Sequence, residues 1–408
     1  MTQSQAMKIL QSGENVFLTG SAGTGKTFLL NEFIGDLKNK KIKAGITAST
    51  GIAATHIGGR TIHSWAGMGI EKNLSPKKMN KLVRNKKTRQ RIEETQTLVI
   101  DEISMLDADR LNLADKICKA IKNPFLPFGG IQVIMSGDFF QLPPVEKDAK
   151  FAYESLAWKE AKVKVCYLDE QFRQNDLVFT GLLNKIRNNS AGADEMNSLK
   201  SRLFKSINGF SKPTKLYTHN ADVDAVNSYE LSRVPGKEMV FSMTSKGPAE
   251  LVKFLKKSCL APEDLKLKTG AMVMFVKNNF EAGYVNGTLG VVTGFNEDNY
   301  PLVKIKSGEE IAATPSGWNI EENEEIVASV NQIPLRLAWA ITVHKSQGMS
   351  LDAAEIDLSR SFEYGMGYVA LSRVRTLAGM RLMGINEGAL RVDPKVLEKD
   401  REFKNLSI

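Results

Sequence analysis

The sequence predicts an α/β protein with two doubly wound, parallel-sheet regions and a small β module inserted in the second. Three observations support this fold class. Short apolar runs without polar alternation, typical of strands buried on both faces of a parallel sheet, recur through the first 170 residues. Helical stretches separate these runs, as parallel strands require. Closely spaced, glycine-rich segments follow, and the α/β pattern returns near Leu335.

The expected strands can be placed by their apolar runs. The first four are NVFLT, TLVI, IQVIM and KVCYL, at residues 15–19, 97–100, 131–135 and 164–168. Residues 177–233 have a helical pattern around one strand at 214–218. From about 238 to 330, segments such as GAMVMFVKN and NGTLGVVTGF combine β-branched residues with Gly and Asn turns, which favours a small antiparallel sheet or barrel. The last strands are expected within LAWAITV and AAEIDL, at residues 337–343 and 353–358.

The composition is that of an ordinary globular protein. The 408 residues suggest two or three domains at roughly 150 residues each, and 42% hydrophobic with 25% charged residues excludes a disordered chain or a fibre. No apolar run reaches the ~18 residues of a membrane span, and the first ten residues lack a signal-peptide core. The four histidines form no metal-spaced cluster. A disulfide framework or zinc site is not expected, and a cytoplasmic location is, because three cysteines lie far apart: Cys118, Cys166 and Cys259.

A phosphate-binding loop is the strongest local signal. The segment GSAGTGKT fits the pattern GxxxxGK[ST], follows an expected strand and precedes an apolar-periodic helix. Glycines let backbone N–H groups curl around phosphates at a helix N-terminus, whose dipole favours anions. Lys26 is expected to reach the outer phosphates of a nucleotide, and Thr27 to place its hydroxyl on Mg²⁺. The nucleotide-binding residues predicted in this loop are Gly20, Ala22, Gly23, Thr24, Gly25, Lys26 and Thr27.

Two adjacent carboxylates end a later expected strand. Asp101 and Glu102 follow the apolar run in LVIDEISM, at the edge where open α/β sheets bind ligands. Taken alone, such a pair is more often a solvated strand end, but downstream of a phosphate loop it indicates a hydrolytic site. Asp101 is then predicted to hold Mg²⁺, directly or through water. Glu102 is predicted to polarise the water that attacks the γ-phosphate.

Three further residues are candidates for the chemistry of hydrolysis. Gln141 follows the strand IQVIM, and its amide is able to donate to a phosphate while accepting from water, which suits a γ-phosphate sensor. An arginine that meets the transition state supplies about three to five orders of magnitude in rate. The candidates are Arg173 in LDEQFRQ and Arg373 in YVALSRVR, although each alone also fits a surface arginine on a helix.

The motifs also occur in a distinctive order. GSAGTGKT, TASTGIAATHIGGRTIHS, LVIDEISM, GDFFQLPPV, LDEQFRQ, AWAITVHKSQGMSLD and YVALSRV span nearly the whole chain. In this order they resemble the superfamily-one helicases of the petite-integration-frequency (Pif) type, which are related to RecD and the phage Dda helicase. The joint presence of LDEQFRQ and HKSQG makes the resemblance specific. One departure is Met349-Ser350, where the family more often has a polar residue followed by Thr.

The resemblance implies an ATP-dependent motor that moves 5′ to 3′ along single-stranded DNA and separates the duplex ahead of it. Such enzymes bind ATP between two RecA-like domains and act in DNA replication, recombination or repair. The implied cofactors are ATP and Mg²⁺. The implied partners of a monomeric enzyme are single-stranded and forked or tailed DNA, with G-quadruplexes as an open further class and no membrane.

Motif matching also assigns individual residues. Gln3 resembles the family's adenine-reading glutamine upstream of the phosphate loop, with Gln5 as the alternative. The segment HKSQG resembles the motif that links the ATP site to DNA, and its Gly348 is expected beside the nucleotide. The catalytic set implied by the match is Lys26, Glu102, Gln141, Arg173 and Arg373.

A track for single-stranded DNA is implied as well. Single strands are held by backbone contacts and by aromatic stacking, worth roughly 1–3 kcal/mol per base. Trp65 is a candidate for stacking on a base or separating the strands, and packing beneath a loop is the equal alternative. His63 alone also fits a capping or core histidine, so its assignment depends on the resemblance. The expected DNA contacts are Ser49, Thr50, Gly51, His63, Ser64, Trp65, Phe140, His344 and Ser350.

Domain boundaries follow from the same match. Residues 1–165 are expected to form the first RecA-like domain, with a short wedge insertion at about 64–84. Residues 166–237 and 331–408 are expected to form the second, interrupted by an SH3-like β insertion at 238–330. On this interpretation the chain is a helicase core with little else.

Other classes of protein explain fewer of these motifs. The nearest alternative is a DNA-stimulated translocase that strips proteins or remodels junctions without processive unwinding. A P-loop GTPase needs an NKxD guanine-reading motif, which the sequence lacks, and a small-molecule kinase leaves HKSQG and two late arginine motifs unexplained. A non-enzymatic nucleic-acid module has no use for the Asp-Glu pair or the sensor glutamine.

The net charge of +9 has a local origin. Between Lys72 and Arg91 the chain carries six Lys and three Arg with no acidic residue, so 46 basic residues balance 46 acidic ones elsewhere. Excess positive charge is compatible with a polyanion partner but does not identify one. The run is either a solvated helix face or a patch that faces phosphates. The second alternative predicts a shallower salt dependence of DNA binding once several lysines are neutralised.

Overall fold

The computed structural model describes most of the chain. The described residues are 1–69, 71–144, 146, 148–172, 176–207, 213–277, 279, 281–284, 287–305, 307–322, 325–347 and 351–407. They fall into two compact units, Met1–Phe210 with Ser346–Ile408, and Ser211–Lys345. Each unit is considered by itself. The domain boundaries expected from the motifs, including the wedge and SH3-like insertions, stay predictions.

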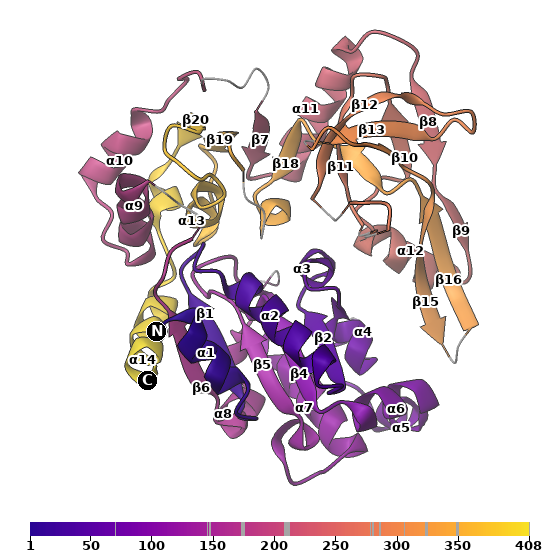
Figure 1. Cartoon of the computed structure of the whole chain (residues 1–408), viewed down its shortest axis with the longest axis vertical. Coiled ribbons are helices and arrows are strands. Elements are labelled where there is room, and N and C mark those ends of the chain that lie inside the picture. The colour runs from indigo at the N-terminus through magenta and orange to yellow at the C-terminus, as the bar shows by residue number, and fades with distance from the viewer. Residues whose placement is uncertain are drawn as a thin grey trace. The chain divides into compact units, whose positions relative to one another are not determined.

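A six-stranded parallel sheet forms the centre of the first unit (Figure 1). Its strand order is β3-β2-β4-β5-β1-β6. The strands are β1 (Val16–Gly20), β2 (Ala44–Ala48), β3 (Arg60–Thr61), β4 (Thr97–Asp101), β5 (Gln132–Ser136) and β6 (Lys164–Leu168). Every residue of β1 and β4 is buried, as in sheets covered on both faces. The α/β class and the first four predicted strands are therefore confirmed.

Helices cover both faces of this sheet, because successive side chains of a strand point to opposite sides. Val16 and Leu18 of β1 join an apolar core with α1 (Gln3–Leu10), α2 (Lys26–Asn39) and α3 (Gly51–His56). Phe17, between them, faces the other way and packs against Trp158 and Phe403, with ring centroids 4.9 Å apart in both pairs. These partners come from α8 (Leu156–Ala161) and α14 (Pro394–Leu406).

The remaining elements of the first unit surround the sheet or form a second strand pair. Around the sheet lie α4 (Ile62–Ala66), α5 (Pro76–Arg84), α6 (Lys86–Glu94), η1 (Ile103–Met105), α7 (Ala108–Ile121), η2 (Pro127–Gly130) and η3 (Ala152–Glu154). The second pair is parallel and accompanied by helices: β19 (Ala354–Leu358), β20 (Met380–Ile385), α9 (Leu177–Arg187), α10 (Ala193–Lys200), α13 (Met366–Leu371) and η5 (Glu387–Leu390). The last helix, α14, lies beside β6, where Ser407 bridges to Val165 (Figure 1).

The second unit is rich in antiparallel strands. A parallel pair, β7 (Thr214–Tyr217) and β18 (Ala340–Thr342), accompanies α11 (Asn220–Arg233). The other strands form sheets of order β14-β13-β12-β11-β17, β15-β16-β9 and β10-β8. Their bounds are β8 (Met239–Ser242), β9 (Thr244–Lys246), β10 (Asp264–Leu267), β11 (Met272–Phe275), β12 (Leu289–Phe295), β13 (Pro301–Ile305), β14 (Glu310–Ala312), β15 (Ser316–Glu322), β16 (Glu325–Gln332) and β17 (Leu335–Leu337).

One helix lies where the sequence suggested only strands and turns. Helix α12 (Ala249–Ser258) follows Pro248, whose fixed φ suits a helix start. Leu251 and Leu255 are four residues apart and so share one face of the helix. This short amphipathic helix was not predicted, because the glycine-rich segments on either side of it favour strands and turns. Within the described ranges, no helix combines the length and apolar character that a membrane span requires.

Candidate nucleotide and nucleic-acid sites

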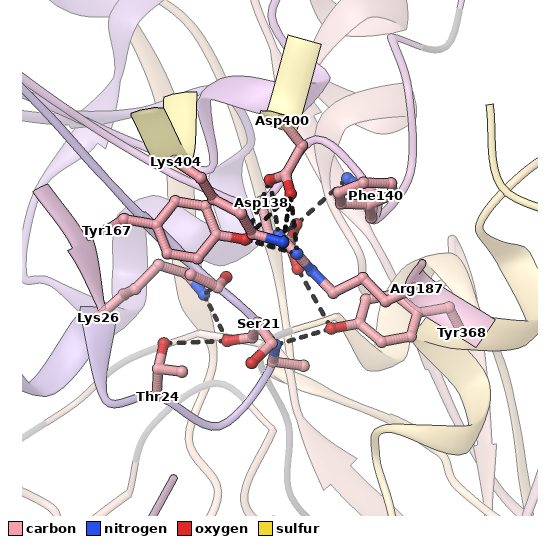
Figure 2. Close-up of polar contacts among 12 residues, drawn as sticks. Ser21, Thr24, Lys26, Asp138, Phe140, Tyr167, Arg187, Tyr368, Asp400 and Lys404 are labelled. Carbon is pink, nitrogen blue, oxygen red and sulfur yellow. Dashed lines mark hydrogen bonds and ion pairs between the residues drawn. The ribbon is translucent and has the colours of Figure 1, made fainter. Parts of the chain in front are cut away.

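The phosphate loop connects β1 to α2 in the first unit. Gly25 ends it in a left-handed conformation with φ 78°, which favours glycine, and a Cβ there would displace the Gln3 side-chain amide. Lys26 Nζ donates to the carbonyl oxygens of Gly20 at 2.8 Å and Ser21 at 3.0 Å (Figure 2). The ammonium group therefore lies over the loop. Thr27, in the first turn of α2, is exposed.

The adenine-reading candidate contacts the same loop. Gln3 Nε2 lies 3.3 Å from the Thr24 carbonyl oxygen and 3.5 Å from that of Gly25. Gln5 has a different task, because its side-chain oxygen accepts the Thr2 backbone N–H at 2.9 Å and closes a capping box at the start of α1. Of the two alternatives, Gln3 is thus the one beside the nucleotide loop.

Two residues of the LDEQFRQ motif touch the loop without having been singled out from the sequence. Gln171 Nε2 donates to Ser21 Oγ at 2.7 Å, and the Phe172 backbone N–H donates to the Gly23 carbonyl oxygen at 3.0 Å. The Phe172 side chain is 58% exposed and lies next to Gly25. An exposed ring beside a glutamine amide offers a surface on which a nucleobase can stack. The LDEQFRQ motif is visible in the sequence, but the only residue assigned within it was Arg173. Arg173 lies outside the described residues.

The carboxylate pair lies where β4 ends. Asp101 is 5% exposed, and its Oδ1 accepts the Glu102 backbone N–H at 2.9 Å. Burial raises the pKa of Asp101, although the hydrogen bond from the Glu102 backbone N–H and the charge of Lys26 oppose the shift. The pKa of Glu102 is raised to about 7, first by burial and then by the adjacent charge of Asp101. The pair is therefore under electrostatic strain that a nearby cation would relieve.

Three cationic or amide groups act on Glu102. Gln347 Nε2, from the HKSQG motif, donates to Glu102 Oε2 at 3.0 Å. The positive charges of Lys26 and Arg373 both favour the ionised form of Glu102 and so lower its pKa. Sequence reasoning assigned HKSQG to this region but did not choose Gln347 within it. The structure therefore brings Lys26, Asp101, Gln347 and Arg373 together around the Glu102 carboxylate.

Arg373 is held by its own helix end. It is 1% exposed, with Nε 2.8 Å from the Val369 carbonyl oxygen and Nη2 2.8 Å from Ser372 Oγ. Nη1 approaches the Ser346 carbonyl oxygen at 3.5 Å. The alternative of a surface arginine is therefore wrong for this residue. Gln141 is also buried, at 6% exposed, in the loop after β5.

The DNA candidates after β2 have contacts of their own. Ser49 is 8% exposed, and its hydroxyl donates to the Glu102 carbonyl oxygen at 2.7 Å. Thr50 Oγ1 accepts the Ala53 backbone N–H at 3.2 Å and so caps α3, whereas Gly51 is exposed. Ser49 thus connects the end of β2 to the carboxylate pair, and it is less accessible than expected of a phosphate donor.

Trp65 does not fit the role of an exposed stacking or strand-separating residue. Its side chain is 2% exposed, and a Cβ on Gly45 of β2 would lie 2.6 Å from Trp65 Nε1, so the indole packs closely on the sheet. Its backbone carbonyl accepts Arg91 Nε at 2.8 Å. The packing alternative is the one observed, because the short helix α4 turns this residue inward. Ser64 beside it is exposed, and His63 is half-buried with its pKa lowered by burial and by Arg110.

Phe140 requires a second correction. It is 2% exposed, and the Arg187 guanidinium lies over its ring, 4.2 Å from the centroid. Phe139 is buried in the aromatic cluster of Phe17 and Trp158. Neither ring is available to a base in this structure. Packing of α9 and α14 against the loop covers both, a long-range effect that local sequence does not reveal.

Three of the candidates cannot be placed. Arg173, Gly348 and Ser350 lie outside the described residues. His344 begins the 3-10 turn η4 (His344–Ser346). Across the part of the chain that the structure describes, no three His, Cys, Asp or Glu side chains form a metal-binding group.

The fold and site together define a class. A buried strand, a glycine-rich loop over a helix N-terminus and an acidic pair on a neighbouring strand of a parallel sheet are the components of a P-loop nucleoside triphosphatase. The family profile described as PIF1-like helicase matches residues 3–191, and that of the DNA helicase Pif1 2B domain matches residues 250–295.

Relatives and solved structures agree with those profiles. The chain is 43% identical to the ATP-dependent DNA helicase Pif1 of Psychrobacter, covering all of this chain and 71% of the relative, and 38% identical to human PIF1, covering 97% and 62%. The crystal structure of the Candida albicans Pif1 helicase matches with a TM-score of 0.90 at 38% identity, over 99% of this chain and 98% of that one. A Bacteroides Pif1 helicase with ADP-AlF3 and single-stranded DNA matches with a TM-score of 0.77 at 32% identity, over 99% and 96%. The chain belongs to the PIF1-like helicase family.

Proposed function

We propose that this chain is an ATP-dependent DNA helicase that moves 5′ to 3′ on single-stranded DNA and unwinds the duplex ahead. The observation that carries the proposal is the convergence of Lys26, Gln347 and Arg373 on the Glu102 carboxylate. A protein that only switches between nucleotide-bound states has no need of such a contact, in which a side-chain amide from the late HKSQG motif binds the catalytic carboxylate. The printed names of the relatives, ATP-dependent DNA helicase Pif1, agree with this activity.

In the proposed hydrolysis each residue has a separate task. Lys26 and the backbone N–H groups of residues 20–27 bind the phosphates, and Gln3 and Phe172 border the base. Glu102 accepts a proton from the attacking water, and Gln141 senses the γ-phosphate. Arg373 stabilises the negative charge of the transition state. Arg173 is proposed as a second such arginine on the strength of its motif alone.

Magnesium is proposed to accompany ATP, with Thr27 and Asp101 as its protein ligands. A carboxylate that is 5% exposed and whose pKa is raised by burial is costly as a lone anion, which makes it a suitable ligand for a divalent cation. Hydroxyl and carboxylate oxygens are the ligands that Mg²⁺ prefers. When bound, the ion would neutralise charge on the β- and γ-phosphates.

Two contacts suggest how the ATP site communicates with DNA. The Ser49 hydroxyl binds the Glu102 carbonyl oxygen, and Gln347 binds its carboxylate. Both belong to segments that resemble DNA-contacting motifs. We therefore expect DNA binding to alter the position of Glu102, so that hydrolysis accelerates on single-stranded DNA. The proposed enzyme acts as a cytoplasmic monomer on forked or tailed DNA, and G-quadruplexes are a further proposed substrate.

The phosphate-loop assignment is tested with Lys26→Ala. This variant is expected to lose DNA-stimulated ATP hydrolysis, because the outer phosphates lose their only lysine from the loop, while binding of single-stranded oligonucleotide stays near the wild-type level. ATPase rates with and without poly(dT), and fluorescence anisotropy of a labelled oligonucleotide, measure the two properties. A Lys26→Ala enzyme that hydrolyses ATP at the wild-type rate would contradict the assignment, and Lys38→Ala on the exposed end of α2 is the matched control.

A further inference from the structure

A buried line of polar contacts begins at the phosphate loop (Figure 2). The Ala22 backbone N–H donates to the Tyr368 hydroxyl oxygen at 2.8 Å, and that hydroxyl donates to Asp138 Oδ2 at 3.3 Å. Ala22 lies in the loop, Tyr368 in α13, and Asp138 in the segment between β5 and Gln141. One oxygen atom thus joins three elements that border the nucleotide site.

Asp138 is held from the other side by a network of buried charges. Arg187 Nη2, at the end of α9, lies 3.2 Å from Asp138 Oδ1 and 3.1 Å from Asp400 Oδ1. Lys404 Nζ lies 3.1 Å from Asp400 Oδ2, so two carboxylates face two cations. The side chains of Asp138, Arg187 and Asp400 are 0%, 4% and 7% exposed. A buried charge without a partner is strongly unfavourable, and here each carboxylate has a cationic partner, with α14 supplying both Asp400 and Lys404.

Two neutral groups also contact Arg187. Its Nη1 donates to the Tyr167 hydroxyl oxygen at 2.6 Å, and its guanidinium covers the Phe140 ring. Burial alone would lower the pKa of Arg187, but the negative charges of Asp138 and Asp400 hold it well above the usual value. Arg187 is therefore a permanent cation that fixes Asp138 in place.

The backbone of α13 is anchored on the same segment. Gly365, at the start of the helix, has a left-handed φ of 77°, and a Cβ there would collide with the carbonyl oxygens of Phe140 and Gln141. Helix α13 then leads directly to Arg373. The helix that carries Arg373 is thus attached at two points, to the sensor segment through Gly365 and to the phosphate loop through Tyr368.

We propose that Tyr368 is a positioning residue for ATP hydrolysis, whose hydroxyl sets the distance between Arg373 and the phosphate loop. Asp138, Arg187 and Asp400 form the buried support that holds this hydroxyl. The inference rests on the proposed role of Arg373 as the arginine that stabilises the transition state. Tyr368 itself acts only through the Ala22 amide and through its own helix.

The effect is expected on turnover and not on ATP affinity. Phosphate binding is spread over many backbone N–H groups and Lys26, whereas stabilisation of the transition state depends on the placement of one guanidinium. A displacement of about 1 Å in such a group costs on the order of a hundredfold in rate. Tyr368→Phe removes one oxygen atom while keeping the ring and its packing.

Steady-state ATPase kinetics at saturating poly(dT) test the proposal in the full chain. Tyr368→Phe is expected to lower kcat about ten- to a hundredfold, with KM for ATP changed less than about threefold and with the wild-type circular dichroism spectrum of a folded chain. Tyr364→Phe, the same chemical change four residues earlier, before α13 begins and at a 48% exposed side chain, is the matched control. A Tyr368→Phe enzyme with wild-type kcat, or with a raised KM alone, would overturn the proposal.

The double variant Tyr368→Phe/Arg373→Ala shows whether Tyr368 acts through Arg373. The expected double variant is no slower than Arg373→Ala, because the arginine to be positioned is already absent. Additive losses would contradict the inference and leave the proposed function intact. If the single variant Arg373→Ala instead hydrolysed ATP at the wild-type rate, Arg373 would not be the arginine that stabilises the transition state. The proposed action of Tyr368 through Arg373 would then be wrong as well.

Asp400→Asn tests the support from the far end, more than 30 residues along the chain from Tyr368. The substitution keeps the shape of the side chain and removes one charge opposite Arg187. A folded Asp400→Asn enzyme is expected to show the same loss in kcat as Tyr368→Phe or a smaller one, without a further loss when the two are combined. An unchanged kcat would exclude Asp400 from the support.

Discussion

At the scale of single residues, Glu102 is held in an unusual backbone conformation. Its φ of 50° and ψ of 46° lie in the left-handed region, which costs a non-glycine residue on the order of 1 kcal/mol or more. Such strain persists only where surrounding contacts fix the residue. Ser49 and Gln347 supply those contacts, one at the Glu102 carbonyl oxygen and one at its carboxylate. The conformation is thus coupled to the two segments expected to meet DNA.

Trp65 provides a prediction about stability. Trp65→Ala removes a side chain that is 2% exposed and packed on β2, so it is expected to lower the free energy of unfolding by about 3–5 kcal/mol. Urea denaturation followed by circular dichroism measures this loss. Phe125→Ala, at a ring that is 90% exposed, is the control and should change stability by less than about 0.5 kcal/mol. If Trp65→Ala were as stable as the control but defective in DNA binding, the residue would be a DNA contact after all.

At the scale of elements, α5 and α6 contain most of the basic run. Several of its cations already have acidic partners, since Lys72 pairs with Glu146, Lys78 with Glu71 and Arg89 with Glu93 at 2.8 Å. Helix α5 has no buried residue. Three of its exposed cations are spaced four and three residues apart and so lie on one face of the helix. They are Lys77, Lys81 and Arg84. These are the residues through which a phosphate-facing patch would act.

Neutralising that face tests the patch. If Lys77, Lys81 and Arg84 contact DNA phosphates, replacing all three with Gln should make the slope of log K against log salt shallower by up to about 2, at ~0.7 per lost contact on single strands. Anisotropy titrations from low to moderate salt measure the slope. The control replaces Lys38, Lys41 and Lys43, which are also exposed. Equal slopes in the two triple variants would favour the solvated-face alternative.

At the scale of the whole molecule, the sequence was most informative where function depends on contiguous residues. The phosphate loop, the Asp101-Glu102 pair and the strands before them follow from local patterns, because each is a short segment with a fixed periodicity. The network around Arg187 joins residues from β6, α9, α13 and α14 and has no local signature. Only the tertiary fold brings such residues together.

Burial was the property that sequence reasoning judged least well. Trp65 and Phe140 are aromatic residues beside expected DNA motifs, and local pattern does not say which face of a loop they occupy. Their burial depends on packing against β2 in one case and against Arg187 in the other. Helix α12 was missed for a related reason, since its short amphipathic pattern lies among glycine-rich strands. Domain boundaries and the residues of the DNA track stay predictions.

The most direct test of the central claim is strand separation on tailed duplexes. With ATP and Mg²⁺, the wild-type chain is expected to displace the labelled strand of a duplex with a 5′ single-stranded tail and to leave a 3′-tailed duplex intact, while Lys26→Ala displaces neither. A fluorescence-quenching assay under single-turnover conditions records both substrates. Displacement from the 3′ tail alone would contradict the polarity, and DNA-stimulated ATP hydrolysis without displacement from either tail would identify a translocase in place of a helicase.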